Sequence, residues 1–506
     1  MGSEMLEFFV IGLTNTFTPF NLLIIILALA AGIIVGAVPG LSAAMATALL
    51  VPFTFGMSPS TGLAMLAAIG VGAVYGGGNS AILLNTPGTP ASVASTFDGY
   101  PMSQRGEADK ALNTSLISSV IGGIIGSICL MFFSIPLSRI ALQLGAPEYF
   151  WITIFALTTI ASLSQGAVFK GVLSGVIGLL AGMIGLDPIT ATPRFTFDYY
   201  PLMQGIDIIA AMIGLFAFSQ MLVLAASMKS TVANYTAKKG IFKKVTARIL
   251  RKSKLNLTRS SLIGSIVGIL PGAGAEIASM VSYTEAKRWS KNSEKYGTGI
   301  TDGMVASESA NNASIGGMLI PTLTLGIPGG AGAAIMMGAL LTHGIQPGSK
   351  LFSNHGDIVY TFMISFLLAN ILLLVVGYFL IKVTVKVLTI PAKYVIAGMV
   401  VLSVIGTYSL RNSMLDVTVM VIFGVIGFLG KRVGLNNGAI ALGLILAPLA
   451  ESSLVQSLLM ASSENSFLQV FVLRPISLVF IILTIVSLGL PSLLMKYKRR
   501  ADSKSR

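Results

Sequence analysis

The chain has 506 residues, of which 54% are hydrophobic and only 10% are charged. A soluble globular domain carries about 25% charged residues, so the composition excludes an ordinary soluble protein and predicts an all-α polytopic membrane protein. The formal net charge of +14 is attributed to basic cytoplasmic loops, and no nucleic-acid partner is expected. The single cysteine, Cys129, excludes an internal disulfide and a cysteine-based metal site.

The chain begins without any lysine or arginine before Arg105. Met1–Phe9 holds two glutamates and no basic residue, which differs from the basic start of a cleaved signal peptide. Phe20–Val38 is long enough to be a full span, or it is the first arm of a re-entrant hairpin whose tip lies at Val38–Ser42. A long apolar run then closes on a polar interruption with two prolines, Asn85–Pro90.

Apolar runs near the length of about 20 residues that a spanning helix needs recur along the rest of the chain. The clearest are Leu112–Pro136, Val168–Leu186, Ile206–Met228, Tyr360–Ile381 and Ile476–Met495, and the shorter runs Tyr394–Tyr408 and Asn436–Pro448 are weaker candidates. Short Gly-x-x-x-Gly units at Gly122–Gly126 and Gly178–Gly182 are predicted to pack helices closely.

Charge predicts the sidedness of these segments. Lys229–Arg259 carries ten basic and no acidic residues, and the tail from Lys496 to Arg506 is also basic. Because basic loops remain cytoplasmic, we expect the C-terminus in the cytoplasm and the acidic N-terminus in the periplasm. Glu451–Gln469, with two glutamates and no basic residue, is predicted to be an outer loop. The apolar spacing within Lys229–Arg259 favours an amphipathic helix lying on anionic lipid.

Two stretches of the chain resemble each other. Gly32–Gly40 (GIIVGAVPG) matches Gly264–Gly272 (GSIVGILPG), and Asn85–Gly88 aligns with Gly326–Gly329. The first copy is entered from the acidic N-terminus and the second from the basic loop, so the copies should have inverted topology. Each copy is predicted to hold a re-entrant hairpin followed by a broken helix, an arrangement typical of secondary transporters.

The predicted organisation has five parts. They are a first core repeat (1–104), first scaffold helices (105–228), a basic cytoplasmic linker (229–259), a second core repeat (260–349), and second scaffold helices with a basic cytoplasmic tail (350–506).

Irregular backbone at membrane depth occurs only where it is buried in protein or lines a wet cavity. A broken helix there offers free carbonyls to a cation and free N–H groups to an anion. Predicted substrate-binding residues are Ser42, Asn85, Thr86, Pro87, Gly88, Thr89, Gly272, Ala273, Gly274, Pro328 and Gly329. Predicted ion-binding residues are Pro39, Gly40, Asn79, Ser80, Asn311, Asn312, Thr322, Thr324 and Gly326. For any single residue, interhelical packing and hydrogen bonding is the alternative explanation.

Intramembrane carboxylates are costly, so Glu276 and Glu308 are functional candidates unless they lie at the interface. Neither the first 104 residues nor Thr301–Ser349 contains a lysine or arginine. A bound anion would therefore depend on a co-bound cation, with Na⁺ favoured and H⁺ the alternative. No nucleotide-binding P-loop is present, and no cofactor or metal other than the coupling cation is expected. His343 and His355 are interpreted as surface residues.

The copies and their flanks resemble the large membrane subunit of the bacterial tripartite tricarboxylate transporters. The resemblance lies in GIIVGAVPGLSAAMATALLVPFTFGMSP, YGGGNSAILLNTPGTPASVASTFDGYPM, GSIVGILPGAGAEIASMVSY and ESANNASIGGMLIPTLTLGIPGGAGAAIMMGALLTHGIQPG. It implies an elevator-type transporter in the bacterial inner membrane. It also implies two partners, a small membrane subunit and a periplasmic substrate-binding protein.

Together these observations predict an ion-gradient-driven secondary transporter subunit rather than an enzyme. It would import small di- or tricarboxylates that the periplasmic binding protein delivers. Two alternatives remain open at this stage: a passive anion channel, and a membrane-embedded enzyme that uses an intramembrane glutamate.

Overall fold

The computed structural model describes residues 2–163, 168–187, 190–226, 241–272, 274–463 and 466–487. In this part of the chain, eight helices are long and apolar enough to cross a membrane. The sheet found there has only two short strands, β1 (Gly185–Leu186) and β2 (Pro193–Arg194), which pair antiparallel in a loop. The chain is therefore an all-α polytopic membrane protein, as its composition predicts.

The helices of the N-terminal half are α1 (Gly2–Thr16), α2 (Pro19–Ala37), α3 (Ala43–Leu50), η1 (Val51–Thr54), α4 (Pro59–Leu84), η2 (Pro90–Ser92), α5 (Val93–Gln104), α6 (Ala108–Ala141), α7 (Ala146–Leu163), α8 (Val168–Gly182), η3 (Tyr200–Gln204), α9 (Ile208–Met212), the π-helical η4 (Ile213–Phe218) and α10 (Ser219–Ala226). The helices that follow are α11 (Ile241–Lys252), α12 (Lys254–Ile269), α13 (Gly274–Trp289), η5 (Ser293–Lys295), α14 (Thr301–Leu325), α15 (Ala331–Thr342), α16 (Leu351–Asn354), α17 (Gly356–Val387), α18 (Ala392–Arg411), α19 (Met414–Val433), α20 (Asn437–Ser463) and α21 (Phe467–Phe471).

The segment predicted as the first hairpin consists of α2 and α3, and α2 is itself one of the eight candidate spans, which agrees with the alternative that the first arm is a full span. The Thr18 side chain caps α2, whose first residue is Pro19, a position where the missing N–H costs nothing. The helix ends before Pro39, and Gly40 takes a left-handed conformation with φ +86°. Ser42 then caps α3 by accepting a hydrogen bond from the Met45 N–H at 3.1 Å. The chain therefore breaks at the residues that the sequence predicts for the hairpin tip.

The second hairpin consists of α12 and α13. α12 ends at Ile269, directly before Leu270 and Pro271, and Gly272 has φ +77°. α13 starts at Gly274, so the predicted tip is again a break between two helices, although Ala273 lies outside the described residues. α12 begins at Lys254, so this helix includes the end of the basic segment Lys229–Arg259.

Each hairpin is followed by a discontinuous helix. α4 ends at Asn85, whose backbone is left-handed with φ 55°, and the chain re-enters helical structure at η2 and α5. α14 ends at Gly326, also left-handed with φ 69°, and continues as α15. Asn and Gly are the residues that tolerate this conformation best. The two helix breaks predicted from the Pro-Gly pairs are confirmed.

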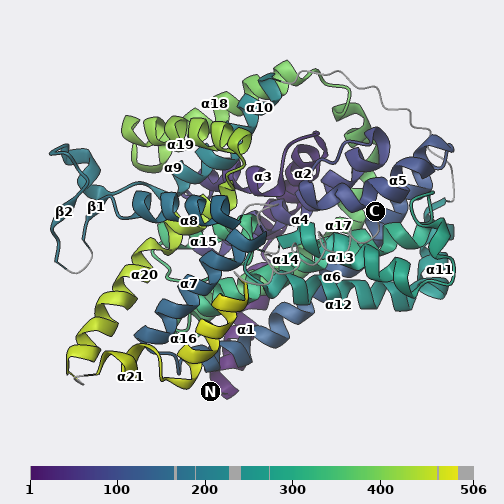
Figure 1. Ribbon diagram of the computed structural model, residues 1–506. Coiled ribbons are helices and arrows are strands. Elements are labelled where there is room, and N and C mark those ends of the chain that lie inside the picture. The colour runs from purple at the N-terminus through teal and green to yellow at the C-terminus, as the bar shows by residue number, and fades with distance from the viewer. Residues whose placement is uncertain are drawn as a thin grey trace, which may run out of the picture.

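α14 forms the centre of the molecule and packs against α6, α12 and α13, while α4 packs against α2 and α17 (Figure 1). Nearly every residue of α14 is buried, yet its length is rich in Ser, Asn and Thr. It is therefore not among the eight apolar candidate spans. A polar helix can occupy this position only because protein, not lipid, surrounds it.

Glycines permit the closest helix crossings. A Cβ atom at Gly122 or Gly126 of α6 would meet the backbone carbonyls of Ser309 or Ala313 of α14. The prediction that these glycines pack helices is confirmed. Gly178 and Gly182 of α8 make the equivalent approach to the backbone of α20.

Some predicted boundaries are wrong. The run Val168–Leu186 is not one span, because α8 ends at Gly182 and β1 follows. The predicted outer loop Glu451–Gln469 is largely helical, since α20 continues through Pro448 to Ser463. The Glu451 carboxylate forms an ion pair with Arg194 in the β1–β2 loop, and this compensates for placing an acidic residue within the helix. The described part of Ile476–Met495 is an apolar helix as far as Ser487, the last described residue.

α11 is the amphipathic helix predicted within the basic segment, but its apolar face does not lie free for lipid. Val245 and Ile249 are buried in a cluster with Ile117 of α6 and Leu257 of α12. Protein therefore covers the side of the helix that the pattern assigned to a lipid surface. α11 and the β1–β2 loop lie at opposite edges of the view in Figure 1.

Candidate functional site

The first arm of the first hairpin and the first helix break touch each other. Gly88 donates its N–H to the Gly77 carbonyl of α4 at 3.1 Å. A Cβ atom at Gly88 would lie 2.7 Å from Gly77 Cα and would also meet the Gly36 carbonyl of α2. Gly88 is therefore held between the helix that has just ended and the hairpin arm beside it, and only glycine fits there.

The second tip and the second break make the same kind of contact. A Cβ atom at Gly329 would lie 2.7 Å from both the Gly268 carbonyl of α12 and Met318 Cα of α14. In addition, the Gly272 N–H at the hairpin tip donates to the Gly329 carbonyl at 3.0 Å. Each hairpin is thus attached to the break of its own half of the chain.

The two sets of contacts correspond residue by residue. Each set joins a Gly-x-x-x-Gly unit of a hairpin arm to aligned backbone carbonyls on the neighbouring discontinuous helix. The contacts of the first set are Gly32 with Ile69 and Gly36 with Ala73, and those of the second are Gly264 with Ala310 and Gly268 with Ser314. The carbonyl residue Ile69 corresponds to Ala310, and Ala73 corresponds to Ser314. Each pair is separated by the same number of positions as Asn85 and Gly326, and as Gly88 and Gly329.

The first break is more open than the second. Asn85 and Thr86 are exposed, whereas Gly326, Pro328 and Gly329 are buried. Asn85 also has a structural role, because its left-handed backbone ends α4. At the tip of the first hairpin, Gly40 faces the Gln220 amide of α10.

Several predicted site hydroxyls donate to their own segment of chain. Ser80 donates to the Gly77 carbonyl at 3.2 Å, Thr322 to the Met318 carbonyl at 2.6 Å, and Thr324 to the Ile320 carbonyl at 2.7 Å. Thr89 shares a 2.9 Å hydrogen bond with Ser92, and Ser42 caps α3. Ser80, Thr322 and Thr324 are thus satisfied locally as donors, which leaves their oxygen lone pairs to accept or to coordinate, whereas Ser42 acts as an acceptor.

Three predicted asparagines behave differently. Asn79 of α4 and Asn311 and Asn312 of α14 are completely buried. Among the described residues, neither amide atom of any of the three has a hydrogen-bond partner. Buried amide groups are nearly always bonded, and an unpaired one costs about 1–3 kcal/mol. These three side chains are therefore the clearest buried amides whose hydrogen-bonding atoms are unpaired within the described residues.

The intramembrane glutamates are in different environments. Glu308 of α14 is completely buried, and its carboxylate accepts hydrogen bonds from Ser95 of α5 and from Ser119 of α6, the latter at 3.2 Å. Glu276 lies in the first turn of α13 and is exposed, where its charge complements the helix dipole. Of these two glutamates, only Glu308 lies within the packed interior.

A second buried carboxylate fastens the two halves of the chain together. Asp98 of α5 accepts hydrogen bonds through Oδ1 from the N–H groups of Gly297, Gly299 and Ile300, at 3.0, 2.7 and 2.9 Å. Its Oδ2 accepts one from the Tyr283 hydroxyl at 2.9 Å. α5 therefore holds the loop that connects α13 to α14.

A further contact between the halves lies close to the first break. The Ser279 hydroxyl of α13 donates to the Ala91 carbonyl of η2 at 2.7 Å. The second hairpin consequently touches the segment in which the first broken helix resumes. The hairpins and broken helices of both halves form one connected body.

The predicted surface histidines are only partly exposed. His343, which caps the end of α15, stacks on Phe55 with ring centroids 5.8 Å apart and lies 3.3 Å from the Thr54 hydroxyl. Burial lowers the pKa of His343. Within the described part of the chain, no group of three or more His, Cys, Asp or Glu side chains is placed to hold a metal.

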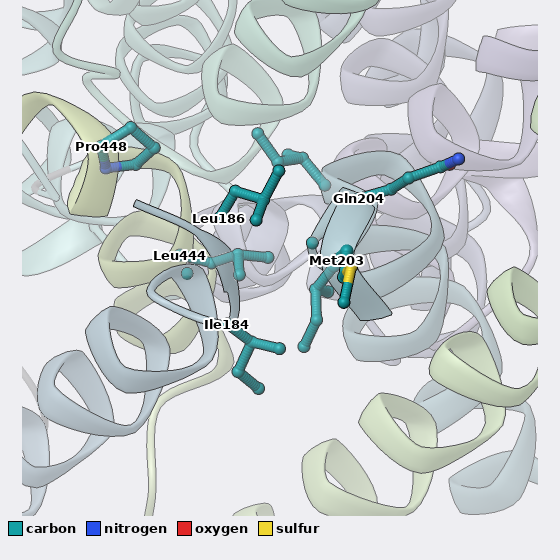
Figure 2. Close-up of a pocket in the computed structure, with 10 residues that line it drawn as sticks. Ile184, Leu186, Met203, Gln204, Leu444 and Pro448 are labelled. Carbon is teal, nitrogen blue, oxygen red and sulfur yellow. The ribbon is translucent and has the colours of Figure 1, made fainter. Parts of the chain in front are cut away.

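One cavity, of about 320 Å³, lies away from the predicted site. Figure 2 shows Ile184, Met203 and Leu444 around it, where the end of α8 and the following loop meet α20. None of the predicted substrate- or ion-binding residues lines it. Its lining is mainly apolar, which does not suit a small carboxylate.

Sequence reasoning missed the surroundings of Glu308. Ser95 and Ser119 come from helices that were not assigned to the site, and Gly78 of α4 closes it from a third direction. The hydroxyl-rich stretch Asn113–Ser119 within an apolar run was a usable signal. Interior polar groups of membrane helices cluster at functional positions.

These features define a multi-pass membrane protein whose interior holds two discontinuous helices, two short-tipped hairpins and buried carboxylates, among them Glu308 and Asp98. Residues 22–442 match the tripartite tricarboxylate transporter TctA family, and the chain belongs to this family. Membership makes it the membrane subunit of a tripartite transporter, which works with partner subunits.

Two relatives from Agrobacterium vitis are similar to this chain. One is an uncharacterized 52.8 kDa protein in the TAR-I ttuC' 3' region, 34% identical over 473 residues that cover 92% of each chain. The other is an uncharacterized protein in the TAR-II ttuC' 3' region, 36% identical over 214 residues, 42% of this chain and 87% of that one. No solved structure matches.

Proposed function

We propose that this chain is the ion-gradient-driven subunit that imports small di- or tricarboxylates delivered by a periplasmic binding protein. The observation that carries the proposal is the pair of helix breaks, each attached to its own hairpin through equivalent glycine contacts. Discontinuous helices place free N–H groups and carbonyls at membrane depth, where a carboxylate and a cation can bind.

The equivalent contacts support an inverted repeat. A chance similarity of Gly-Pro segments would not reproduce four glycine–carbonyl contacts at a constant offset along the discontinuous helices. The charge pattern supports opposite orientations, because the basic segment 229–259 lies between the copies. We place the protein in the bacterial inner membrane, with a periplasmic N-terminus and a cytoplasmic C-terminus.

We also propose an elevator motion, which the bonds between the halves support. Asp98 bonds the loop before α14, and Ser279 bonds the segment after the first break. Two repeats fastened in this way would move as one rigid core. The more peripheral helices, including α18 to α20, would then serve as the scaffold and as a contact surface for the small membrane subunit.

Cation coupling is supported by the charge at the breaks. Neither the first 104 residues nor Thr301–Ser349 contains a lysine or arginine. A bound di- or tricarboxylate would therefore have no basic side chain from these segments and would need a cation beside it. Na⁺ suits the carbonyl, hydroxyl and amide oxygens present, and H⁺ is the other source of the charge.

The test is reconstitution of the chain with its small membrane subunit and candidate binding proteins in liposomes. Uptake of labelled di- and tricarboxylates is measured with and without a Na⁺ or H⁺ gradient. Accumulation that requires a gradient and saturates supports the proposal. Gradient-independent, non-saturating flux would instead favour the passive anion channel.

A variant tests the site directly. Asn85→Leu should abolish uptake while the free energy of unfolding falls by only about 1–2 kcal/mol, the cost of a left-handed Leu, because the side chain is otherwise exposed. Asn412→Leu provides a matched control, because Asn412 also ends a helix, α18, in a left-handed conformation with φ 51° but lies outside both repeats. Normal transport by Asn85→Leu would remove this side chain from the site.

A further inference from the structure

We propose that Glu308 is the site at which the coupling cation binds, and this inference rests on the proposed ion-driven function. Its carboxylate is enclosed by α14 itself, by Ser95 of α5 and Ser119 of α6, and by α4. A Cβ atom at Gly78 of α4 would lie 2.8 Å from Glu308 Oε1. Position 78 is therefore a glycine, since any larger residue would collide with the Glu308 carboxylate.

Charge is the first reason. Glu308 takes part in none of the ion pairs formed within the described residues. The effective cost of burying an unpaired carboxylate is several kcal/mol even after relaxation. Two hydroxyl donors offset only part of that cost, so the site favours the arrival of one positive charge.

Unsatisfied neutral oxygens are the second reason. Asn311 and Asn312 follow Glu308 by three and four positions on α14, so their side chains lie one turn further along the helix. Asn79 directly follows Gly78 on α4. All three amides are buried without a partner among the described residues. The amides of Asn311 and Asn312, together with the serine hydroxyls, supply the kind of oxygen ligands that a hard monovalent cation prefers, whereas Asn79 points to another side of α4 than Gly78.

Position provides the link to the substrate. Gly78 is adjacent to Gly77, whose carbonyl accepts the Gly88 N–H at the first helix break. Glu308 is on the discontinuous helix of the other half. A cation at Glu308 would therefore draw α4, α5, α6 and α14 together and would stabilise the first break in one arrangement. Coupling requires such a differential effect on two states.

The experiment compares Glu308→Gln with Glu294→Gln, a control in the exposed loop before α14. Gln keeps the size of the side chain and removes its charge. The first measurement uses the purified chain alone and records its Tm against NaCl, with choline chloride as reference. The second measures substrate accumulation and substrate exchange in the reconstituted transporter under Na⁺ and H⁺ gradients.

If Na⁺ is the ion, NaCl should raise the Tm of the wild type and of Glu294→Gln but not that of Glu308→Gln. If H⁺ is the ion, NaCl should leave all three unchanged, and a pH gradient should drive accumulation in all but Glu308→Gln. In either case Glu308→Gln should still exchange substrate. Full cation-driven accumulation by Glu308→Gln would overturn the inference.

The controls separate this inference from the proposed function. A wild type that lacks any gradient dependence refutes ion coupling itself, whereas a coupled wild type with a coupled Glu308→Gln variant refutes only the site. If Glu308→Gln does not fold, Ser119→Ala keeps the carboxylate and removes one hydroxyl. Ser119→Ala should raise about tenfold the cation concentration that gives half of the maximal rise in Tm or in accumulation. An unchanged concentration would count against the site.

Discussion

The Asp98 clamp allows a quantitative test of how the two halves are held together. Asp98 is completely buried and accepts three backbone N–H groups and one tyrosine hydroxyl. Asp98→Ala would leave all four donors without their acceptor. Hydrogen bonds to a charged group contribute about 1.5–3 kcal/mol each, but they are not additive, and water can reach the exposed part of the loop. We therefore expect a loss of about 3–5 kcal/mol, and about 1–2 kcal/mol for Asp98→Asn, which keeps one acceptor.

Limited proteolysis measures this opening. Lys295 lies just before the clamped residues and is exposed, so trypsin should cut there when the loop detaches. If opening is fast relative to cleavage, the rate follows the open population. A change of about 3 kcal/mol then accelerates cleavage at Lys295 about 100-fold in Asp98→Ala.

The matched control is Asp198→Asn, in the exposed loop that follows β2, which should leave cleavage at Lys295 unchanged. Cleavage after Lys393, in the first turn of α18, reports on general unfolding within the same digest. An equal acceleration at both lysines would mean that Asp98 stabilises the whole fold. No acceleration at Lys295 would refute the clamp.

Three further predictions concern other contacts. Gly36→Ala should lower the free energy of unfolding by about 1–3 kcal/mol, and so lower the Tm in detergent, because the added methyl would lie 2.6 Å from the Ala73 Cα. The control Gly332→Ala places its methyl where no atom lies within 4 Å and should leave the Tm unchanged. Equal Tm values for the two variants would refute the close crossing. Burial lowers the pKa of His343, so the unfolded chain binds more protons below about pH 6.5. Stability should therefore fall as the pH drops from about 6.5 through the pKa of His343 in the folded state. His343→Gln should make the Tm depend less on pH in this range, and an unchanged pH dependence would contradict the prediction. Arg194→Gln should lower the Tm, and a double-mutant cycle with Glu451→Gln should give a coupling energy of about 1 kcal/mol, while strict additivity would exclude a contribution from this pair.

The sequence located the helix breaks because their causes are local. Proline removes a backbone donor and glycine permits a positive φ, so Pro39-Gly40 and Pro271-Gly272 stop their helices in whatever tertiary context they lie. Asn85 and Gly326 end their helices in the left-handed region for the same local reason. The positions of both hairpin tips could therefore be read without a structure.

The sequence was less informative wherever the partner of a segment decides its structure. α14 is too polar to be recognised as a span by hydropathy, and it can lie in the interior because other helices, above all α6, α12 and α13, surround it (Figure 1). The apolar side of α11 suited lipid and protein equally well. α20 continues beyond Pro448 to a glutamate whose counterion, Arg194, is far away in the chain.

The sequence by itself thus determined the membrane class, the family, the breaks and the corresponding glycines, since composition and short-range backbone chemistry are written in consecutive residues. Only the tertiary structure decided which polar groups of the core find partners. Ser95, Ser119 and Gly78 reach Glu308 from three separate helices, while three nearby asparagines are left unpaired. No pattern along the chain encodes that difference, because each contact depends on how distant helices pack.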